Sequence, residues 1–425
     1  MQALSFAVAL YRRQLAINYW GRVRRDPLSR LHLAEGRDDP YSIYDEIRAR
    51  GPMAPTLLGN YATATHQVCD AVLRDRRFGP SAVEMNGRGA PGDEIDMSML
   101  DKDPPEHTRL RRVAQPAFSP KQIAGYRPRV ERVVGDLLDQ AAAKGTFDLV
   151  GDFAAPLPIA VISDLLGIPD ADTDAFAEHG AVIGSALDGV RSLRHAARLM
   201  AASNALDEVF LRLFELRRRQ PADDAVSRIL AAEGDQIQSH EVLPMCRLLL
   251  VAGFETTVNL IGNAVQALLD HPEQWEALCA DPAGLADAAV EETLRWDSPV
   301  QRTSRCARED VELAGRTIRR GEFVVCLLGG ANRDPEVFAD ATRFDLHRVP
   351  EADHLAFSSG IHYCVGAPLA RLEVGTALRL LAERMPGLRR AGQSRRRDAG
   401  IIRGPRTLPV AVEKTGARSA PVSTS

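Results

Sequence analysis

One cysteine in this sequence stands where a thiolate could bind a metal. Cys364 lies in the segment FSSGIHYCVGAP at residues 357–368, just before residues whose apolar spacing is that of a helix. Free backbone N–H groups and the helix dipole stabilise a thiolate at a helix N-terminus. Glycines on both sides, Gly360 and Gly366, would let the backbone approach a large planar ligand. A lone cysteine is more often a small buried apolar residue, but this flanking pattern favours a metal ligand.

A second group of chemically capable residues lies in an apolar stretch. Residues 248–269 carry a single charge, Glu255, which is followed by Thr256. Such a stretch is long enough to span a membrane, but its threonines, asparagines and glutamine favour a helix buried in a large protein. Gly253 costs a helix ~1 kcal/mol, and one reason for it would be that a flat cofactor or a bound diatomic molecule approaches the backbone there. Local hydrogen bonds could satisfy Glu255 and Thr256, or the two could pass protons into an apolar cavity.

The elements that position these residues are predicted to be mainly helical, with a minor β portion. Apolar residues recur at helical spacing in 120–143, 196–216 and 371–385, and shorter β-like runs lie at 53–62, 311–318, 323–328 and 407–412. Residues 319–321 read as the turn of a hairpin. Residues 81–99 read as a long irregular loop and 170–193 as a mobile helix pair. No linker or repeat divides the chain, so we expect one large domain.

Both ends of the chain differ from this domain. Residues 1–29 form a short, arginine-interrupted apolar segment, and residues 414–425 are small and polar. The first segment is too short to span a bilayer and lacks the features of a signal peptide, so we expect an amphipathic helix on the protein body and no transmembrane segment. Weak contact with a membrane surface is the alternative. The tail is predicted to be disordered, and the protein to be a cytoplasmic monomer.

Composition excludes several classes of function. The net charge is −4, which gives no global basic field for nucleic acid. Six cysteines occur without a C-x-x-C pair, so neither a zinc site nor an iron–sulfur cluster is supported, and a disulfide framework is not expected in a large cytosolic chain. No dinucleotide-binding glycine motif follows a strand.

An ordered set of motifs resembles the cytochromes P450, most of all the soluble actinobacterial members. The matching stretches are HTRLR at 107–111, AGFETT at 252–257, ETLR at 292–295, SPVQ at 298–301, ANRDP at 331–335, FSSGIHYCVG at 357–366 and LPV at 408–410. The resemblance covers residues 30–413 and implies the P450 fold, in a single catalytic domain over those residues. One position departs from the common pattern, because Ser358 stands where glycine is usual, and serine adopts positive φ less readily.

The resemblance assigns roles to particular residues. It implies haem b (iron protoporphyrin IX) with the Cys364 thiolate as axial ligand, and proton delivery during oxygen activation by Thr256 and Glu255. Glu292 and Arg295 would form a buried structural pair, whereas an exposed pair would contribute only ~0–1 kcal/mol. Further implied cofactor contacts are the propionate partners His107, Arg111, Arg305 and His362, together with Ala252, Gly253, Phe357 and Gly366.

The same resemblance implies a monooxygenase that uses O2 and receives electrons from NAD(P)H through a ferredoxin reductase and a ferredoxin. One or more of Arg109, Arg111 and Arg112 would dock the ferredoxin, and for Arg109 and Arg112 a solvated basic face without a partner is the equal alternative. The substrate is expected to be a hydrophobic small molecule, polyketide-like, macrolide-like or lipid-like. Its predicted contacts are Met85, Leu187, Val251, Val300 and Ile402.

Three rival functions stay open at this point. A peroxide-driven haem-thiolate enzyme usually lacks the acid–threonine pair. A non-catalytic haem sensor or carrier would not need that pair. A membrane-tethered enzyme would require the N-terminal segment to bind lipid.

Overall fold

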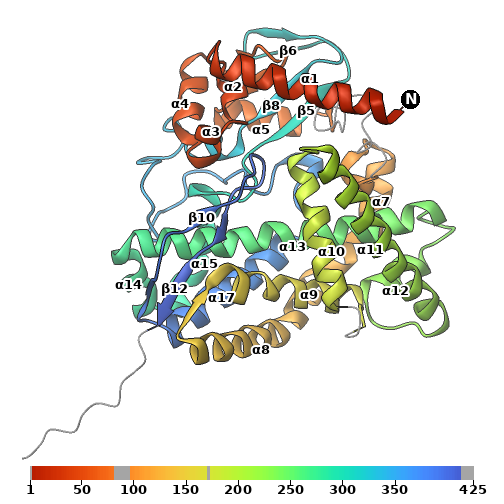
Figure 1. Ribbon diagram of the computed structural model, residues 1–425, viewed down its shortest axis with the longest axis vertical. Helices are drawn as coiled ribbons and strands as arrows, with labels where there is room; N and C mark the ends of the chain where they lie inside the picture. Colours follow the sequence, from red (N-terminus) through yellow and green to blue (C-terminus); the bar gives the residue numbers. More distant parts are fainter. Residues whose placement is uncertain (1, 81–95, 170–172, 413–425) are drawn as a thin grey trace, which may run out of the picture.

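A buried helix forms the centre of the molecule. The computed structural model of the chain describes residues 2–80, 96–169 and 173–412. Helix α13 (Ser239–Asp270) crosses the middle of the fold and packs against α9 (Pro156–Leu166), α10 (Thr173–Gly184), α15 (Pro282–Trp296) and α17 (Ala367–Arg384) (Figure 1). It is apolar on nearly all sides, so it is stable only where other helices surround it. In the described residues it is the one helix long and apolar enough to cross a membrane, and most of it is buried here.

The remaining helices surround this centre. Two long ones, α8 (Pro120–Lys144) and α11 (Leu193–Arg219), close the helical half of the molecule. The shorter α-helices are α1 (Gln2–Arg22), α2 (Pro27–Arg30), α3 (Ala34–Asp38), α4 (Tyr41–Ala49), α5 (His66–Arg74), α7 (Glu106–Ala114), α12 (Ala225–Ala231), α14 (Pro272–Ala280) and α16 (Leu328–Ala331). Single turns of 3₁₀ helix occupy Ser98–Asp101, Gln115–Phe118, Ser185–Asp188 and Gly360–His362, and a π-turn occupies Val150–Ala154. The prediction of a mainly helical fold is confirmed.

The β structure is minor and lies mostly beside the N-terminal helices. A five-stranded sheet has the order β1 (Ala54–Pro55), β2 (Tyr61–Thr63), β8 (Phe323–Cys326), β5 (Thr303–Ala307), β3 (Phe78–Gly79). Strands β2 and β8 are parallel, with Ala62 opposite Val325, and the other pairs are antiparallel. A three-stranded sheet joins β4 (Thr146–Asp148), β12 (Pro409–Val412) and β9 (Leu388–Arg390), and β10 (Arg395–Arg396) pairs with β11 (Pro405–Thr407).

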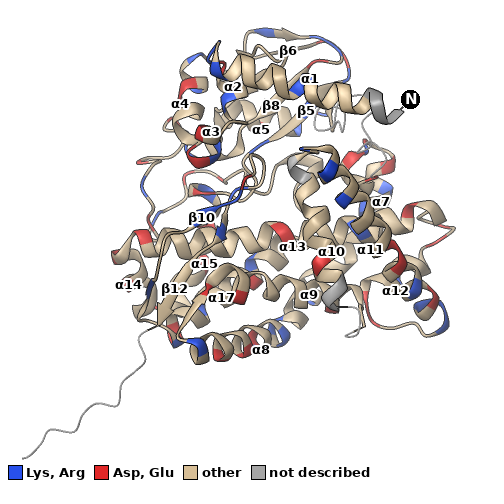
Figure 2. Cartoon of the chain, viewed as in Figure 1, with Lys and Arg blue, Asp and Glu red and all other residues tan. Residues whose placement is uncertain are grey.

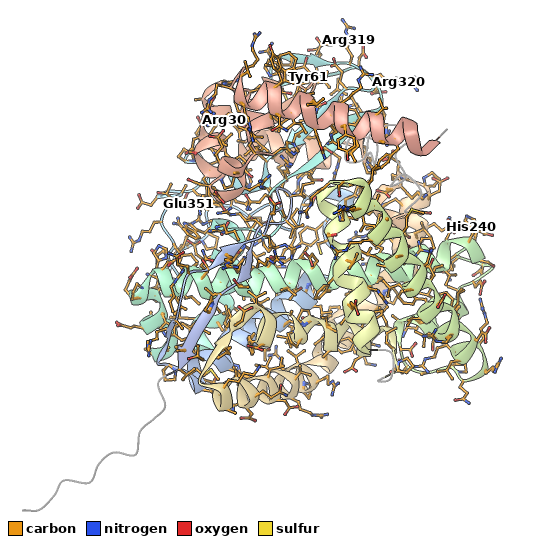
Figure 3. The ribbon with its side chains drawn as sticks, viewed as in Figure 1. Arg30, Tyr61, His240, Arg319, Arg320 and Glu351 are labelled. Carbon is orange, nitrogen blue, oxygen red and sulfur yellow. The ribbon has the colours of Figure 1, made fainter. Side chains whose placement is uncertain are left out.

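The predicted hairpin around 319–321 is wrong. The turn lies earlier, at Ala314 and Gly315, which have φ of 51° and 73° and join β6 (Val311–Leu313) to β7 (Arg316–Ile318). Two successive residues at positive φ match the twist of a tight two-residue hairpin. Arg319 and Arg320 point away from the body at the outer end of the sheet (Figure 3). The strand that follows them, β8, pairs with β2 and β5 instead.

The N-terminal helix lies on the protein body. Phe6 and Leu10 of α1 pack against Ala196, and the Gln14 side chain donates a hydrogen bond of 2.6 Å to the Arg191 carbonyl. Its outward face exposes large apolar residues: Val8, Tyr11, Leu15 and Tyr19. Elsewhere along the chain, acidic and basic residues are interspersed (Figure 2). The predicted tail at 414–425 lies outside the described residues.

Candidate functional site

A single large cavity collects most of the residues singled out from the sequence. It has a volume of about 980 Å³ and lies between α13, the segment that precedes α17, and strand β5. Cys364 lines it from one wall and Thr256 from the α13 wall. The other predicted cofactor contacts that line it are His107, Arg111, Ala252, Gly253, Arg305, Phe357, His362 and Gly366.

The Cys364 sulfur lies at the start of a helix, as the sequence predicts. Helix α17 begins at Ala367, and the Cys364 N–H donates a hydrogen bond of 2.9 Å to the Phe357 carbonyl, which closes the loop. Burial raises the pKa of the Cys364 thiol, while the N–H groups of Gly366 and Ala367 and the charge of Arg111 act to lower it. The surroundings of Cys364 therefore already contain backbone N–H groups that favour its thiolate form, and a bound metal would complete the deprotonation of the thiol.

The loop before this cysteine is held by two residues at positive φ. Gly360 has a φ of 67°, and a Cβ there would lie 2.5 Å from the Leu73 carbonyl oxygen. Close approach at Gly360 is therefore to α5, not to a planar ligand as the sequence suggested. Ser358 also adopts the left-handed conformation, with a φ of 63°. Serine tolerates this conformation only at a cost of ~1–2 kcal/mol.

Four basic side chains gather on one side of the cavity. The rings of His107 and His362 lie 4.3 Å apart, and Arg111 donates a hydrogen bond of 2.8 Å to the Tyr363 carbonyl. Burial, followed by the charges of Arg305, His107 and Arg111, lowers the pKa of His362 to about 3. Burial also lowers the pKa of Arg305 and of His107. This cluster is short of negative charge and fits one or more buried carboxylates.

On the opposing helix, side chains bond to the carbonyls of the preceding turn. Thr256 Oγ1 donates to the Ala252 carbonyl at 3.0 Å, and Thr257 Oγ1 to the Gly253 carbonyl at 3.2 Å. Such bonds hold threonine hydroxyls against the helix backbone and tend to bend it. Gly253 lines the cavity, but a Cβ there would lie 3.0 Å from Ile162 Cδ1 of α9. The close approach predicted at Gly253 is thus made by a neighbouring helix.

The structure does not bring Glu255 into the cavity beside Thr256. The Glu255 carboxylate is buried and forms an ion pair with Arg397, from the chain between β10 and β11. A Cβ at Gly184, at the end of α10, would lie 3.2 Å from Glu255 Oε2. Because adjacent helical residues point in directions about 100° apart, Thr256 faces the cavity while Glu255 faces α10 and Arg397.

Known proteins resemble the chain along almost its whole length. The family model described as Cytochrome P450 matches residues 284–384. Cytochrome P450 107B1 of Saccharopolyspora erythraea is 39% identical over 400 residues, which cover 92% of this chain and 94% of that protein. The chain belongs to the cytochrome P450 family. It is therefore an oxidoreductase of the monooxygenase type, and haem is the cofactor that its family implies.

Two further relatives have names that mention a small molecule. The mycinamicin IV hydroxylase/epoxidase of Micromonospora griseorubida is 40% identical over 351 residues, covering 80% of this P450 and 86% of that protein. The crystal structure of the myxobacterial CYP267B1 in complex with myristic acid superposes with a TM-score of 0.83 at 35% identity, covering 91% of this chain and 99% of that one. These matches confirm the predicted family and fold.

The residues present fit a haem. His107 Nδ1 and His362 Nε2 are buried without a hydrogen-bond partner among the described residues, and both side chains line the cavity beside Arg111 and Arg305. Propionate carboxylates would satisfy this cluster. The Cys364 sulfur, with N–H groups directed at it, supplies the soft anionic ligand that haem-thiolate iron requires.

Glu292 and Arg295 form the buried pair of α15. Arg295 Nη2 lies 2.7 Å from Glu292 Oε1 and Arg295 Nε 2.8 Å from Glu292 Oε2, and both side chains are 4% exposed. The guanidinium also donates to the carbonyls of Asn332, Ala341 and Arg343. The pair thus ties α15 to the segment that precedes the cysteine loop, and it lies outside the cavity lining.

The predicted substrate contacts are only partly within the described structure. Val251, Val300 and Ile402 line the cavity, and Val300 pairs with Ile402 as an isolated antiparallel bridge. Met85 lies outside the described residues, and so does the side chain of Leu187 in the 3₁₀ turn Ser185–Asp188.

The sequence reasoning missed other residues at the site. Glu373 of α17 lines the cavity, is 2% exposed, and has an Oε2 atom without a hydrogen-bond partner in the described part of the chain. Burial raises its pKa well above the ordinary value, which favours the uncharged carboxylic acid. Its position on the inner side of an amphipathic helix was a usable signal. No sequence pattern indicated Arg397, His32 or Arg302, since only the fold brings these residues to the site.

Proposed function

We propose that this P450 inserts one oxygen atom from O2 into a hydrophobic small molecule of polyketide, macrolide or lipid type, by hydroxylation or epoxidation. The observation that carries this proposal is that the Cys364 sulfur and the Thr256 hydroxyl line one cavity whose walls also include Val251, Val300 and Ile402. The descriptions of two relatives, which mention mycinamicin IV and myristic acid, support this range of substrates.

The cofactor in this proposal is haem b. Cys364 would hold its iron, and the cluster of His107, His362, Arg111 and Arg305 would hold its propionates; when bound, the haem would supply the oxygen-activating chemistry. The protein supplies the surroundings of that chemistry. Apolar walls exclude water and orient the substrate, while the N–H groups of Gly366 and Ala367 stabilise negative charge on sulfur.

Proton control is assigned to two neighbouring residues with different surroundings. The Thr256 hydroxyl rests on the Ala252 carbonyl and can rotate to donate into the cavity. The Glu255 carboxylate forms an ion pair with Arg397, on the side of α13 away from the cavity. A proton taken up at the Glu255 carboxylate therefore reaches Thr256 through water or through rotation of the Glu255 side chain away from Arg397.

Thr256→Val tests this assignment, with Thr257→Val as the matched control. Both hydroxyls bond to a carbonyl one turn back, so both variants lose the same kind of local contact. Thr256→Val should keep NAD(P)H consumption but divert most of it from product to hydrogen peroxide, and Thr257→Val should keep product yield within about twofold, because a positioned proton donor contributes roughly 10²-fold or more. Equal product yield from both variants would refute the role of Thr256.

Electrons are proposed to come from NAD(P)H through a ferredoxin reductase and a ferredoxin. Of the three arginines on α7 considered for docking, Arg109 is engaged with Glu241 at 2.7 Å and Arg111 turns toward Tyr363, whereas Arg112 is exposed. The docking role therefore narrows to Arg112. Arg112→Glu should slow reduction by an acidic ferredoxin and weaken its dependence on salt. Reduction rates that are unchanged by this charge reversal would remove Arg112 from the docking site.

The setting of this activity is also proposed. Residues 30–413 form the catalytic domain of a cytoplasmic monomer, with residues 1–29 as an added amphipathic segment. The contacts of Phe6 and Leu10 with the body support a helix that belongs to the folded protein. Gel filtration of the holoenzyme, compared with sedimentation alongside liposomes, tests both statements.

A further inference from the structure

Two segments far apart in the sequence form one apolar wall of the cavity. Val300 and Ile402 both line it and pair with each other as an isolated antiparallel bridge. Beside this bridge, the Arg403 N–H donates a hydrogen bond of 2.7 Å to the Pro299 carbonyl. Two paired segments are only marginally stable by themselves. The position of this wall, which we call the Val300–Ile402 wall, therefore depends on contacts at its ends.

A buried ion pair flanks the Val300–Ile402 wall. Asp297, at the end of α15, lies shortly before one partner of the bridge, and Arg403 directly follows the other. Arg403 Nε donates to Asp297 Oδ1 at 2.8 Å, and the two side chains are 8% and 6% exposed. Burial acts to raise the pKa of Asp297, but the charges of Arg403 and of other nearby arginines lower it, so the carboxylate is charged. A charge-assisted bond in this setting holds the two segments in one arrangement.

Asn263 ties the same wall to the central helix. Its side chain is buried in α13, and Nδ2 donates to the carbonyls of Asp297 and Arg403 at 2.9 and 3.1 Å. A carbonyl can only accept, so the nitrogen of the amide faces both residues. Asn263 lies about two helical turns after Thr256, which places the two side chains on the same side of α13. One side chain therefore sets the distance between the wall and the Thr256 hydroxyl.

Two further hydrogen bonds hold the wall against α3. Arg403 Nη1 and Nη2 donate to the carbonyls of Arg37 and Asp38 at 2.9 and 3.2 Å. In the part of the chain that the structure describes, the cavity lining does not include Asp297, Arg403 or Asn263. These three side chains can therefore act on a bound molecule only through the wall that they hold.

We propose that Asp297, Arg403 and Asn263 are positioning residues for the oxygen insertion. They hold the Val300–Ile402 wall at a fixed distance from Thr256. This distance decides which apolar molecules fit the cavity and which of their atoms lie near the Thr256 hydroxyl. A misplacement of about 1 Å can slow a reaction about 10²-fold, so a firmly held wall matters for the rate as well as for the fit. The inference rests on the proposed monooxygenase function and adds to it the residues that set the position of the substrate.

The test uses imidazole and 4-phenylimidazole as probes of the holoenzyme. Both bind a haem iron through a ring nitrogen, and only the second carries an apolar ring that has to fit against the cavity walls. The ratio of their dissociation constants, measured from the absorbance change of the haem, therefore reports the fit of the apolar ring. Amide hydrogen exchange of residues 298–303 and 400–405 reports, without any ligand, how firmly the wall is held.

Two variants release the wall from different sides. Asp297→Asn removes the ion pair, and Asn263→Leu removes both bonds from α13. Each should speed exchange in the two wall segments and reduce the affinity advantage of 4-phenylimidazole over imidazole by at least about fivefold, because apolar contact with the added ring is lost. Val300→Ala removes such contact directly and should also reduce this advantage, and adding Asp297→Asn to it should change the ratio by no more than about twofold.

Asp224→Asn is the matched control for Asp297→Asn. Asp224 is also buried and paired with an arginine, Arg217, whose guanidinium donates to the Gly167 carbonyl at 2.9 Å. Neither member of this pair is among the described residues that line the cavity. Asp224→Asn should lower the free energy of unfolding in urea by an amount comparable to Asp297→Asn. It should nevertheless keep the ratio of dissociation constants within about twofold of the wild type and leave exchange in the wall segments unchanged.

Several outcomes would overturn the inference. They are an unchanged ratio in either wall variant that folds with haem bound, an equal fall in Asp224→Asn, and a ratio that does not respond to Val300→Ala. Imidazole binding and the thiolate-specific carbon monoxide spectrum separate this inference from the proposed function. If both persist while the ratio is unchanged, only the positioning role fails. If both are absent from the wild-type protein, the proposed function fails and the positioning role fails with it.

Discussion

Glu292→Gln should destabilise this P450 far more than Glu291→Gln at the neighbouring position. The two glutamates lie side by side on α15 and each forms a two-bond ion pair with an arginine. Glu292 bonds to Arg295 at 2.7 and 2.8 Å with both side chains 4% exposed, and Glu291 bonds to Arg371 at 2.6 and 3.0 Å with side chains 42% and 36% exposed. Each glutamate also has a further basic partner, His354 Nε2 at 3.1 Å for Glu291 and Arg348 for Glu292, so the main difference between the two pairs on this helix is burial.

The expected magnitudes follow from that burial. Glu292 also accepts from the Asp345 N–H at 3.0 Å and from Arg348 Nε, so its loss of charge leaves the Arg295 guanidinium in the interior without its counter-ion. Breaking a buried pair by removing one partner costs about 3–5 kcal/mol, whereas an exposed pair contributes about 0–1 kcal/mol. Since whole domains are stable by only about 5–15 kcal/mol, Glu292→Gln should remove a large part of the total.

Urea unfolding of both variants, followed by far-ultraviolet circular dichroism, measures this difference. Glu292→Gln should lower the free energy of unfolding by at least about 2 kcal/mol more than Glu291→Gln, with similar denaturant slopes. Variants that agree to within about 1 kcal/mol would contradict the reasoning, because burial would then not decide what the pair contributes.

Three further predictions concern single residues. The pKa of Glu241 is lowered to about 2 by hydrogen bonds from Arg109, so the stabilisation by this ion pair is present above pH 4.5 and is lost as the pH falls toward 2. Glu241→Gln should therefore lower the free energy of unfolding by about 1–3 kcal/mol at pH 7 but by much less at pH 3, as measured by urea titrations. The pKa of Glu373 is raised by burial, so the folded protein keeps a proton on this carboxyl that the unfolded chain releases above pH 4.5. Glu373→Gln should therefore raise the free energy of unfolding by about 1–3 kcal/mol at pH 7 and leave it unchanged below pH 4, as measured in the same way. Ser358→Gly should raise the free energy of unfolding by about 0.5–1 kcal/mol, because it relieves strain at positive φ at the cost of a more flexible unfolded chain. Gly360→Ala should be strongly destabilising, because its Cβ would meet the Leu73 carbonyl. Thermal unfolding of the two variants tests both statements.

What could be predicted from the sequence was encoded locally. Cys364 and the helix after it occupy one short segment, so their relation is fixed by neighbouring residues. The same holds for the central helix, whose apolar character on all sides requires burial, and for Glu292 and Arg295, which share a helix face at a spacing of three.

What could not be predicted depends on contacts between distant segments. The strand β8 was expected to pair with its predecessor, but β2 and β5 compete for it, and the Ala314–Gly315 turn already closes β6 on β7. Gly253 was explained by a ligand, whereas Ile162, some 90 positions earlier, fills that space. The ion-pair partner of Glu255 is Arg397, and no spacing in the sequence indicates that these two residues meet.

The central claim is that the Cys364 thiolate, at the start of α17, holds a haem iron. The most direct test is the absorption spectrum of the purified, reduced, haem-loaded protein under carbon monoxide. We predict the red-shifted Soret band of a thiolate ligand, and its loss in Cys364→Ala while circular dichroism still reports the folded protein. A protein that lacks this band, or a Cys364→Ala variant that retains it, would contradict the account.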